Sequence, residues 1–432
     1  MHLKTILALS VAPVLVMGAA TQADASTHIH DGACLTCAGG LLPGGTTGYQ
    51  PIDRWTSTFT NGGGIVQGTP ITLTWSIVPD GTDISGESSN SNLIGALDSA
   101  FGSGGGSDLT TRPWFSLFSQ SFDRWSELAG LDYIYVTDDG AQHSNSFPGS
   151  STRGDVRIAG VNIDGGGGTL AYNYFPNRGD MVIDTADMGF FASANNNFRA
   201  GRNIVMHEHG HGMGIAHVVS NNASFLMEPS INTSFDGPQF DDILSAQRLY
   251  GDVLEKNGGN DTAGTATSFG ALPHGAGVSI GFDANDAFVS ANDVSFVSID
   301  DDSDVDFYSF TVDAFTGISI HLTPLGPTYN EGAQGGSQSP LVTSAMSDLT
   351  LALYDTDGTS LLASVNEAGL GGSESILFDL FDDGTYFIRV GGLNNSIQMY
   401  QLDLLTTAIP EPAAGALLAG SLLLALRRRR AA

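Results

Sequence analysis

Met206-His-Glu-His-Gly-His-Gly-Met-Gly-Ile-Ala-His-Val218 is the stretch around which the rest of the chain can be interpreted. His207 and His211 are four residues apart, so a helix would present both imidazoles on one face. Gly214 can adopt a positive φ and end that helix, which would let the chain turn back and bring His217 to the same place. Three imidazole ligands leave a fourth tetrahedral position for water, as a catalytic zinc ion requires.

The residues between the histidines add to this pattern. Glu208 follows the first histidine, where a carboxylate can act as base toward a water held by the metal. A purely structural cluster of core histidines is the alternative, and the joint spacing of three His, Glu208 and Gly214 favours the metal site. His209 is expected to point away and to be exposed or to stand behind the ligands. Gly210, Gly212 and Gly214 would each weaken an isolated helix by about 1 kcal/mol relative to Ala, so they predict close packing of backbone or strands against the site.

The motif from His207 to His217 resembles the extended zinc signature of the metzincin metalloproteases. Downstream, Ser224-Phe-Leu-Met-Glu-Pro229 resembles the Met-turn, and its L-M-x-P form is similar to that of the matrixin branch. The stretch from Asp241 to Gly251 resembles the closing helix of matrixins. Val218 departs from the pattern, because matrixins usually carry Ser there. The resemblance covers roughly residues 71–251.

The resemblance implies a role for each of these residues. One zinc ion would be held by His207, His211 and His217, and would polarise the scissile carbonyl and acidify a water. Glu208 would take the proton of that water and deliver it to the leaving amine. Met227 would shape the floor of the site without binding the metal.

A second constellation consists of an Asp-Gly loop and three later carboxylates. Asp164-Gly-Gly-Gly-Gly-Thr-Leu-Ala171 is followed by Asp180, Asp184 and Asp187, and oxygen donors around a glycine loop suit calcium. A solvated acidic loop is the alternative, since Asp-Gly stretches are common turns. The matrixin resemblance implies structural calcium at Asp164, Asp184 and Asp187.

Vertebrate-type matrixins carry a second, structural zinc on three His and one Asp around this loop. In this chain Tyr172 and Val182 occupy two of the aligned positions, and no His lies between His143 and His207. Tyr and Val do not replace imidazole as zinc ligands. The sequence therefore predicts one zinc.

The apolar periodicity predicts an α/β (α+β) catalytic domain with a mixed sheet. Alternation predicts a strand at 71–77, and helical spacing predicts a helix that runs from Phe115 and stops at Gly130. Further strands are expected at 131–136, 155–161 and 181–184, followed by the metal-binding helix. After a polar, Gly- and Asn-rich linker, alternating runs separated by acidic turns predict an all-β sandwich, with strands at 305–312, 318–322, 349–354, 376–380, 386–390 and 400–404. These runs resemble bacterial pre-peptidase C-terminal domains, and their acidic turns could hold calcium, although Asp is common in turns.

Both ends of the chain carry export signals. Residues 1–25 have the basic start, apolar run and small-residue cleavage site of a secretory signal peptide, too short for a membrane anchor. Pro410-Glu-Pro412, the apolar run that follows and Arg427–Arg430 resemble the PEP-CTERM sorting signal of Gram-negative bacteria, against the alternative of an ordinary tail anchor. That resemblance implies transient inner-membrane insertion, processing by an exosortase, and a surface, outer-membrane or extracellular destination.

The predicted organisation has six parts: signal peptide 1–25, N-terminal linker or pro-segment 26–50, matrixin-like catalytic domain 51–252, linker 253–265, β-sandwich domain 266–408 and sorting segment 409–432. The N-terminal part holds His28, His30, Cys34 and Cys37. A Cys34–Cys37 disulfide, a small separate metal site, and a thiol that caps the catalytic zinc are the alternatives there.

The predicted function is that of a secreted or surface zinc-dependent endopeptidase acting on protein or peptide substrates. A formal charge of −30 with only 16 Lys and Arg argues against nucleic acid as a partner and suits calcium and an extracellular setting. The alternatives are a catalytically silent surface or matrix-binding protein with a vestigial protease fold, and a metal-dependent hydrolase of a non-peptide bond. The intact Glu208 argues against the first alternative and the Met-turn against the second.

Overall fold

A five-stranded mixed sheet organises the N-terminal unit of the computed structural model, which describes residues 49–104, 106–221 and 224–410. Its strand order is β4-β3-β5-β7-β6, in which only β6 runs antiparallel. The strands of this unit are β1 (Ser57–Thr58), β2 (Gly62–Gly63), β3 (Ile71–Ile77), β4 (Leu131–Tyr135), β5 (Val156–Val161), β6 (Ala171–Asn173), β7 (Met181–Asp184) and β8 (Val218–Ser220). Strands β3 and β7 have the predicted bounds, and β4 and β5 lie within the predicted ranges.

Helices cover this sheet, and the hydrophobic core of the first unit lies between the helices and the sheet. They are α1 (Leu93–Phe101), α2 (Phe115–Leu128), α3 (Met188–Phe191), α4 (Arg199–Met213) and α5 (Phe240–Tyr250). The aromatic side chains Phe118, Phe122 and Trp125 of α2 are buried, and Phe122 packs against Trp75 of β3 with ring centroids 4.9 Å apart. Helix α2 also lies against α4, since Trp125 donates its indole N–H to the carbonyl of Met206. The mixed α/β architecture predicted for this half is therefore confirmed.

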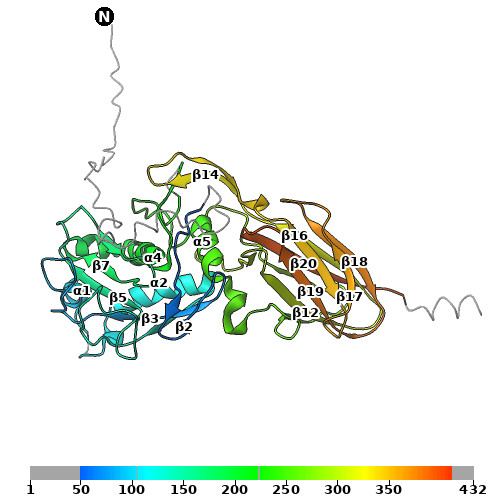
Figure 1. Cartoon of the computed structure of the whole chain (residues 1–432), viewed down its shortest axis with the longest axis horizontal. Helices are drawn as coiled ribbons and strands as arrows, with labels where there is room; N and C mark the ends of the chain where they lie inside the picture. Colours follow the sequence, from blue (N-terminus) through cyan, green and yellow to red (C-terminus); the bar gives the residue numbers. More distant parts are fainter. Residues whose placement is uncertain (1–48, 105, 222–223, 411–432) are drawn as a thin grey trace, which may run out of the picture.

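The C-terminal unit is built from two five-stranded sheets packed face to face (Figure 1). One contains β10-β20-β13-β18, with β11 paired to β20, and the other has the order β17-β16-β19-β12-β9. Alternate residues of both sheets, such as Tyr308 and Tyr400, are fully buried between them. The strands are β9 (Thr267–Ala271), β10 (Gly277–Ile280), β11 (Ser298–Ile299), β12 (Val305–Val312), β13 (Thr316–Pro324), β16 (Leu349–Tyr354), β17 (Leu361–Val365), β18 (Glu374–Leu380), β19 (Gly384–Gly392) and β20 (Gln398–Ala408).

The two units share buried surface. Phe240 and Leu244 of α5 belong to one buried cluster with Phe296 and Met399 of the β unit. The stretch 253–265, predicted as a linker, contains the 3₁₀ helix η4 (Val253–Gly258) and a fully buried Asn260. A hairpin of β14 (Thr328–Ala333) and β15 (Ser339–Val342) leaves the β unit and reaches back over the first unit (Figure 1).

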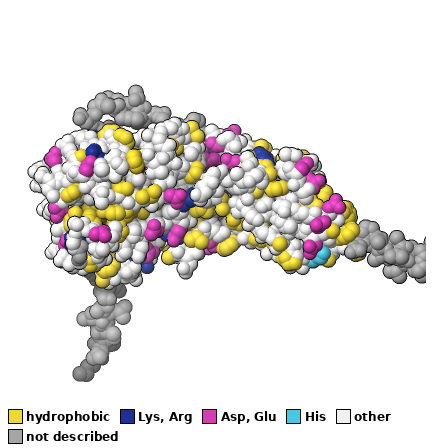
Figure 2. Space-filling view, turned by 90° about the horizontal axis from the view of Figure 1, so that it is seen from below, with side chains coloured by type: hydrophobic (Ala, Val, Ile, Leu, Met, Phe, Trp, Pro, Cys, Tyr) yellow, Lys and Arg dark blue, Asp and Glu magenta, His cyan; other side chains and the backbone are white. Residues whose placement is uncertain are grey.

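Acidic side chains are spread along both units on the face drawn in Figure 2, where Lys and Arg are few. None of the helices in the described ranges combines the length and apolar composition needed to cross a membrane. The predicted signal peptide, the residues His28 to Cys37 and the predicted PEP-CTERM segment beyond residue 410 lie outside the described residues.

Candidate metal centre

Helix α4 carries the first two histidines of the motif and ends at the predicted glycine. Gly214 has φ +107° and ψ 18°, a left-handed conformation that favours glycine. The Gly214 N–H donates to the carbonyl of His211, and the Ile215 N–H donates to that of Gly210 at 3.0 Å, which is a Schellman-type end. The reversed chain then runs through His217 into β8.

Each of the three glycines in the helix contacts another part of the chain. A Cβ at Gly210 would lie 2.3 Å from the sulfur of Met227, and one at Gly212 would lie 2.7 Å from the amide nitrogen of Asn173 in β6. A Cβ at Gly214 would lie 2.0 Å from the carbonyl oxygen of Asp53. The predicted close packing is confirmed, and it explains why helix-weakening residues occupy these positions.

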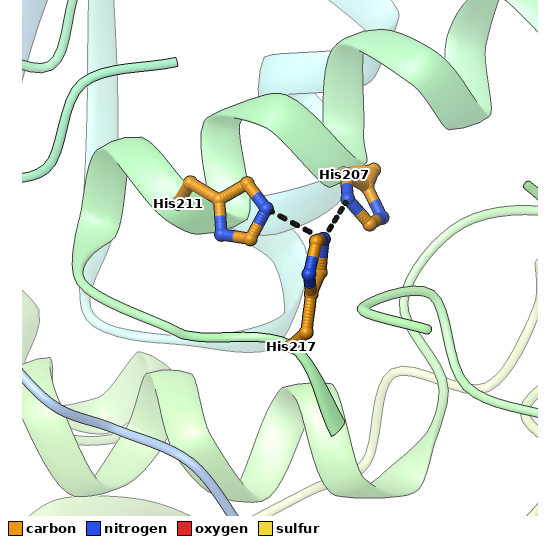
Figure 3. Close-up of side chains that lie close together, drawn as sticks. All are labelled: His207, His211 and His217. Atoms are coloured by element: carbon orange, nitrogen blue, oxygen red, sulfur yellow. Dashed lines mark hydrogen bonds between the residues drawn. The ribbon is translucent and has the colours of Figure 1, made fainter. Parts of the chain in front are cut away.

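The three histidines converge on one point through their Nε2 atoms (Figure 3). The Nε2 of His217 lies 3.3 Å from that of His207 and 3.1 Å from that of His211. Each Nδ1 faces an oxygen acceptor. This acceptor is the carbonyl of Leu226 at 2.6 Å for His207, the carbonyl of Ile215 at 2.8 Å for His211, and the side-chain oxygen of Gln334 at 2.6 Å for His217. Each Nδ1 therefore carries the ring proton, and the three Nε2 lone pairs face one another.

This arrangement fits a zinc ion. Tetrahedral zinc with Zn–N bonds of about 2.0–2.1 Å places its nitrogen ligands about 3.3 Å apart, which matches the observed separations. Burial, together with the charge that His217 would carry, lowers the pKa of His207 to about 3 and that of His211 well below its usual value. Both rings are therefore neutral, as metal ligands must be, and three lone pairs directed at one point are unfavourable without a cation between them.

Glu208 lies in α4 directly after His207 and is only 7% exposed. Its Oε2 is buried and has no hydrogen-bond partner among the described residues. Burial raises the pKa of this carboxyl to about 8. The carboxyl therefore keeps its proton at neutral pH in the metal-free chain. A cation held by the neighbouring histidines would favour the carboxylate, which could then accept a proton.

Met227 lies beneath the histidine helix and is fully buried. The turn that contains it is held by Asp242, which accepts the N–H groups of Leu226 at 2.8 Å and Met227 at 3.0 Å. Asp242 also accepts the N–H of Gln239 at the start of α5. Helix α5 therefore holds the turn at Met227 in place through the side chain of Asp242.

Of the two expectations for His209, exposure to solvent is wrong, and a buried position behind the other histidines is what the structure has. The residue is fully buried, and its ring packs edge-on against Phe122 and Tyr133 at centroid distances of 5.0 and 5.2 Å. Its Nε2 is 2.7 Å from the hydroxyl of Tyr133. Because α2 and β4 cover the back of α4, the helix face opposite His207 and His211 is shielded from solvent.

The carboxylates predicted to bind calcium lie around one loop, but they accept hydrogen bonds from backbone N–H groups there. The carboxylate of Asp164 accepts the Thr169 N–H, that of Asp187 accepts the Gly167 N–H, and Oδ1 of Asp184 accepts the Ala186 N–H at 2.7 Å. The three carboxylates do not form a group within 4.8 Å in the part of the chain that is described. The other carboxylate oxygen of Asp184 is buried without a partner there. Calcium binding at this loop stays a prediction.

The residues considered for a second zinc ion are Tyr172, Val182 and His143, and each of them is buried among other protein groups. Tyr172 and Val182 face each other across β6 and β7 and are buried. His143 is fully buried, with Nε2 2.9 Å from the carbonyl of Arg157 and Nδ1 2.7 Å from the hydroxyl of Ser144. Burial lowers the pKa of His143 to about 4. Both ring nitrogens of His143 therefore have protein partners.

Sequence reasoning missed two features of functional interest. Glu255, Asp261 and Asp304 place carboxylate oxygens within 4.8 Å of one another at the junction of the two units. Burial, reinforced by the neighbouring acids, raises the pKa of Glu255 to about 9 and that of Asp300 to about 8. The acidic turn before β12 was the available signal for this cluster. The second missed feature is Gln334, which had no signal because it lies in a Gly-rich turn.

The fold and this site together define a two-unit chain with a metalloprotease-like centre in its first half. Residues 105–251 match the matrixin family, Peptidase_M10, and residues 304–392 match the bacterial pre-peptidase C-terminal domain. The first match includes the helix that carries His207 and His211, and the second lies within the β unit.

Individual proteins match the first half at low identity. The hatching enzyme of Paracentrotus lividus is 30% identical over 169 residues, which are 38% of this chain and 25% of that protein. The interstitial collagenase of Bos taurus is 32% identical over 148 residues, 33% of this chain and 29% of that protein. The chain thus spans less than a third of either relative. A solved pre-peptidase C-terminal domain of a Bacillus anthracis collagenase aligns with 33% of this chain and 96% of its own at 12% identity and a TM-score of 0.17.

Proposed function

We propose that this chain is a secreted or surface zinc-dependent endopeptidase. The observation that carries the proposal is the convergence of three imidazoles, in which the Nε2 atom of His217 lies 3.3 Å from that of His207 and 3.1 Å from that of His211. The matrixin match over residues 105–251 and the metalloprotease relatives support the same class. His207, His211 and His217 would hold one zinc per chain, which when bound supplies a Lewis acid that polarises a carbonyl and acidifies a water.

The remaining chemistry belongs to residues of the chain. Glu208 would accept a proton from the attacking water and pass it to the leaving amine, since its buried Oε2 has no protein partner in the described residues. Met227 would form the floor, because its sulfur lies close to α4, 2.3 Å from where a Cβ at Gly210 would be. The chain spans less than a third of these relatives, so its substrate is proposed only as protein or peptide.

The rest of the proposal concerns stability and location. Structural calcium would bind the loop of Asp164, Asp184 and Asp187, where one buried oxygen of Asp184 lacks a partner among the described residues. Export would use the signal peptide at 1–25. The PEP-CTERM segment at 409–432 would insert transiently in the inner membrane of a Gram-negative bacterium and be processed by an exosortase.

A catalytically silent surface or matrix-binding protein is the second candidate. It is favoured by the large β unit, which matches a domain type distinct from the protease half. A binding protein has no need of a buried carboxylate with a free oxygen beside the histidines, so Glu208 discriminates between the two. Peptidase activity decides the matter.

The experiment is to incubate the chain without its signal peptide with a mixed peptide library, with chelator, without chelator, and after chelator removal with added zinc. We expect cleavage that chelation abolishes and zinc restores, with one zinc per chain by metal analysis. Zinc-loaded protein that cleaves no peptide would favour the binding protein. Cleavage that survives complete removal of zinc would overturn the proposed mechanism.

A further inference from the structure

The hairpin formed by β14 and β15, residues 328–342 and called the arm below, belongs to the β unit by sequence. Strand β14 nevertheless pairs antiparallel with β8 of the first unit, with Glu331 opposite Ser220 and Ala333 opposite Val218. Continued by one residue, this register sets Gln334 opposite His217. Residues directly opposite in an antiparallel pair have neighbouring side chains on one face.

The side chain of Gln334 uses this position to contact the third histidine. Its Oε1 lies 2.6 Å from Nδ1 of His217. An amide oxygen only accepts hydrogen bonds, so this contact keeps the ring proton on Nδ1 and leaves the lone pair of Nε2 directed toward the other two histidines. The contact thereby selects both the tautomer and the orientation of the ring that a metal ion requires.

The arm is anchored where it meets the first unit. The ring of Tyr329 packs against Phe225 at a centroid distance of 4.8 Å, and its hydroxyl donates to Oδ1 of Asp241 at 2.8 Å. Glu331 and Gly332 are buried. A Cβ at Gly332 would lie 2.5 Å from the carbonyl oxygen of Ser337, so the arm folds tightly on itself. These contacts limit the freedom of the turn that carries Gln334.

His217 differs from the other two histidines in the group that accepts the hydrogen bond of its Nδ1 atom. The Nδ1 atoms of His207 and His211 donate to backbone carbonyls of the first unit, at Leu226 and Ile215. Only His217 depends on a side chain, and that side chain comes from 117 residues further along the chain. The orientation of the third histidine is therefore coupled to the docking of the arm.

We propose that Gln334 is a positioning residue through which the C-terminal β unit completes the zinc site of the first unit. The inference rests on the proposed function only in that the three histidines bind zinc. Partners that accept the second ring N–H of a ligating histidine typically contribute 10–100-fold to metal affinity or activity. Removing the acceptor should weaken zinc binding even though Gln334 is not itself a ligand.

The test measures zinc affinity of the full chain by competition with a chromogenic chelator. Gln334→Met keeps the length and volume of the side chain without an acceptor, and Gln334→Glu keeps an acceptor. Gln338→Ala is the matched control, because Gln338 is an exposed glutamine of the same arm. We expect roughly 10–100-fold weaker binding in Gln334→Met, affinity at or above wild type in Gln334→Glu, and no change in the control.

Two results would overturn the inference: wild-type affinity in Gln334→Met, or an equal loss in Gln334→Met and Gln334→Glu. Melting temperatures of the metal-free variants show whether a loss comes from unfolding, and the Glu variant tests the acceptor even if the Met variant is less stable. The proposed function fails separately, because a chain that cleaves no peptide can still show zinc affinity that depends on Gln334.

Discussion

Replacing Gly214 by alanine tests the turn that brings His217 to the other two histidines. Gly214 has φ +107°, and a residue with a side chain in the left-handed region costs roughly 1–2 kcal/mol. The new Cβ would also lie 2.0 Å from the carbonyl oxygen of Asp53, a backbone atom that cannot rotate away. Overpacking of this kind costs about 1–3 kcal/mol more, so we expect a total destabilisation of about 2–5 kcal/mol.

Gly86→Ala separates the two contributions. Gly86 also has a positive φ, +93°, but a Cβ there would have no atom within 4 Å. Gly86→Ala should lower the free energy of unfolding by the backbone strain alone, about 1–2 kcal/mol. The difference between the two variants therefore reports the contact between Gly214 and the segment that contains Asp53.

The assay is urea unfolding followed by tryptophan fluorescence. All four tryptophans, Trp55, Trp75, Trp114 and Trp125, lie in the first unit, so the signal reports the unit that contains the turn. Zinc affinity measured on the same variants should fall in Gly214→Ala and stay unchanged in Gly86→Ala. If Gly214→Ala unfolds at the same urea concentration as Gly86→Ala, the close approach to Asp53 does not constrain the turn and the reasoning is refuted.

Three further predictions concern catalysis, calcium and pH. Glu208→Ala should retain zinc in metal analysis but lose peptide cleavage by about 10²–10⁴-fold, because the base is removed while the ligands remain; cleavage at the wild-type rate would contradict the assignment. Calcium at about 100 times its dissociation constant should stabilise the wild type by about 2.7 kcal/mol and raise its melting temperature more than that of Asp184→Ala; equal responses would remove calcium from that loop. Glu255, Asp300 and Asp304 have raised pKa values of about 9, 8 and 6. The folded chain therefore keeps protons that the unfolded chain loses above about pH 4. As a result, this cluster lowers the free energy of unfolding progressively from about pH 4 to pH 9. In the presence of chelator, the melting temperature of Asp304→Asn should therefore exceed that of wild type by a margin that grows from pH 5 to pH 8. A margin that does not change with pH would show that ionisation of this cluster does not destabilise the fold.

The sequence alone determined the local features of the site. The spacing of His207 and His211 requires only a helix, and the end of that helix at Gly214 follows from the conformational freedom of one residue, so both could be read without any long-range contact. Strands β3, β7, β12 and β16 begin and end at the residues predicted from the sequence, because a short apolar run is a local pattern.

Tertiary structure decided the features that depend on segments far apart in the chain. Tyr133 and Phe122 enclose His209, which helical geometry alone could not reveal. Glu255 and Asp304 meet only because the two units share buried surface. Gln334 reaches His217 through a strand pairing whose register is set by packing of the arm on the first unit. A glutamine between Ala333 and Gly335 belongs to no periodic pattern and no motif, so its role arises only when the β unit has docked.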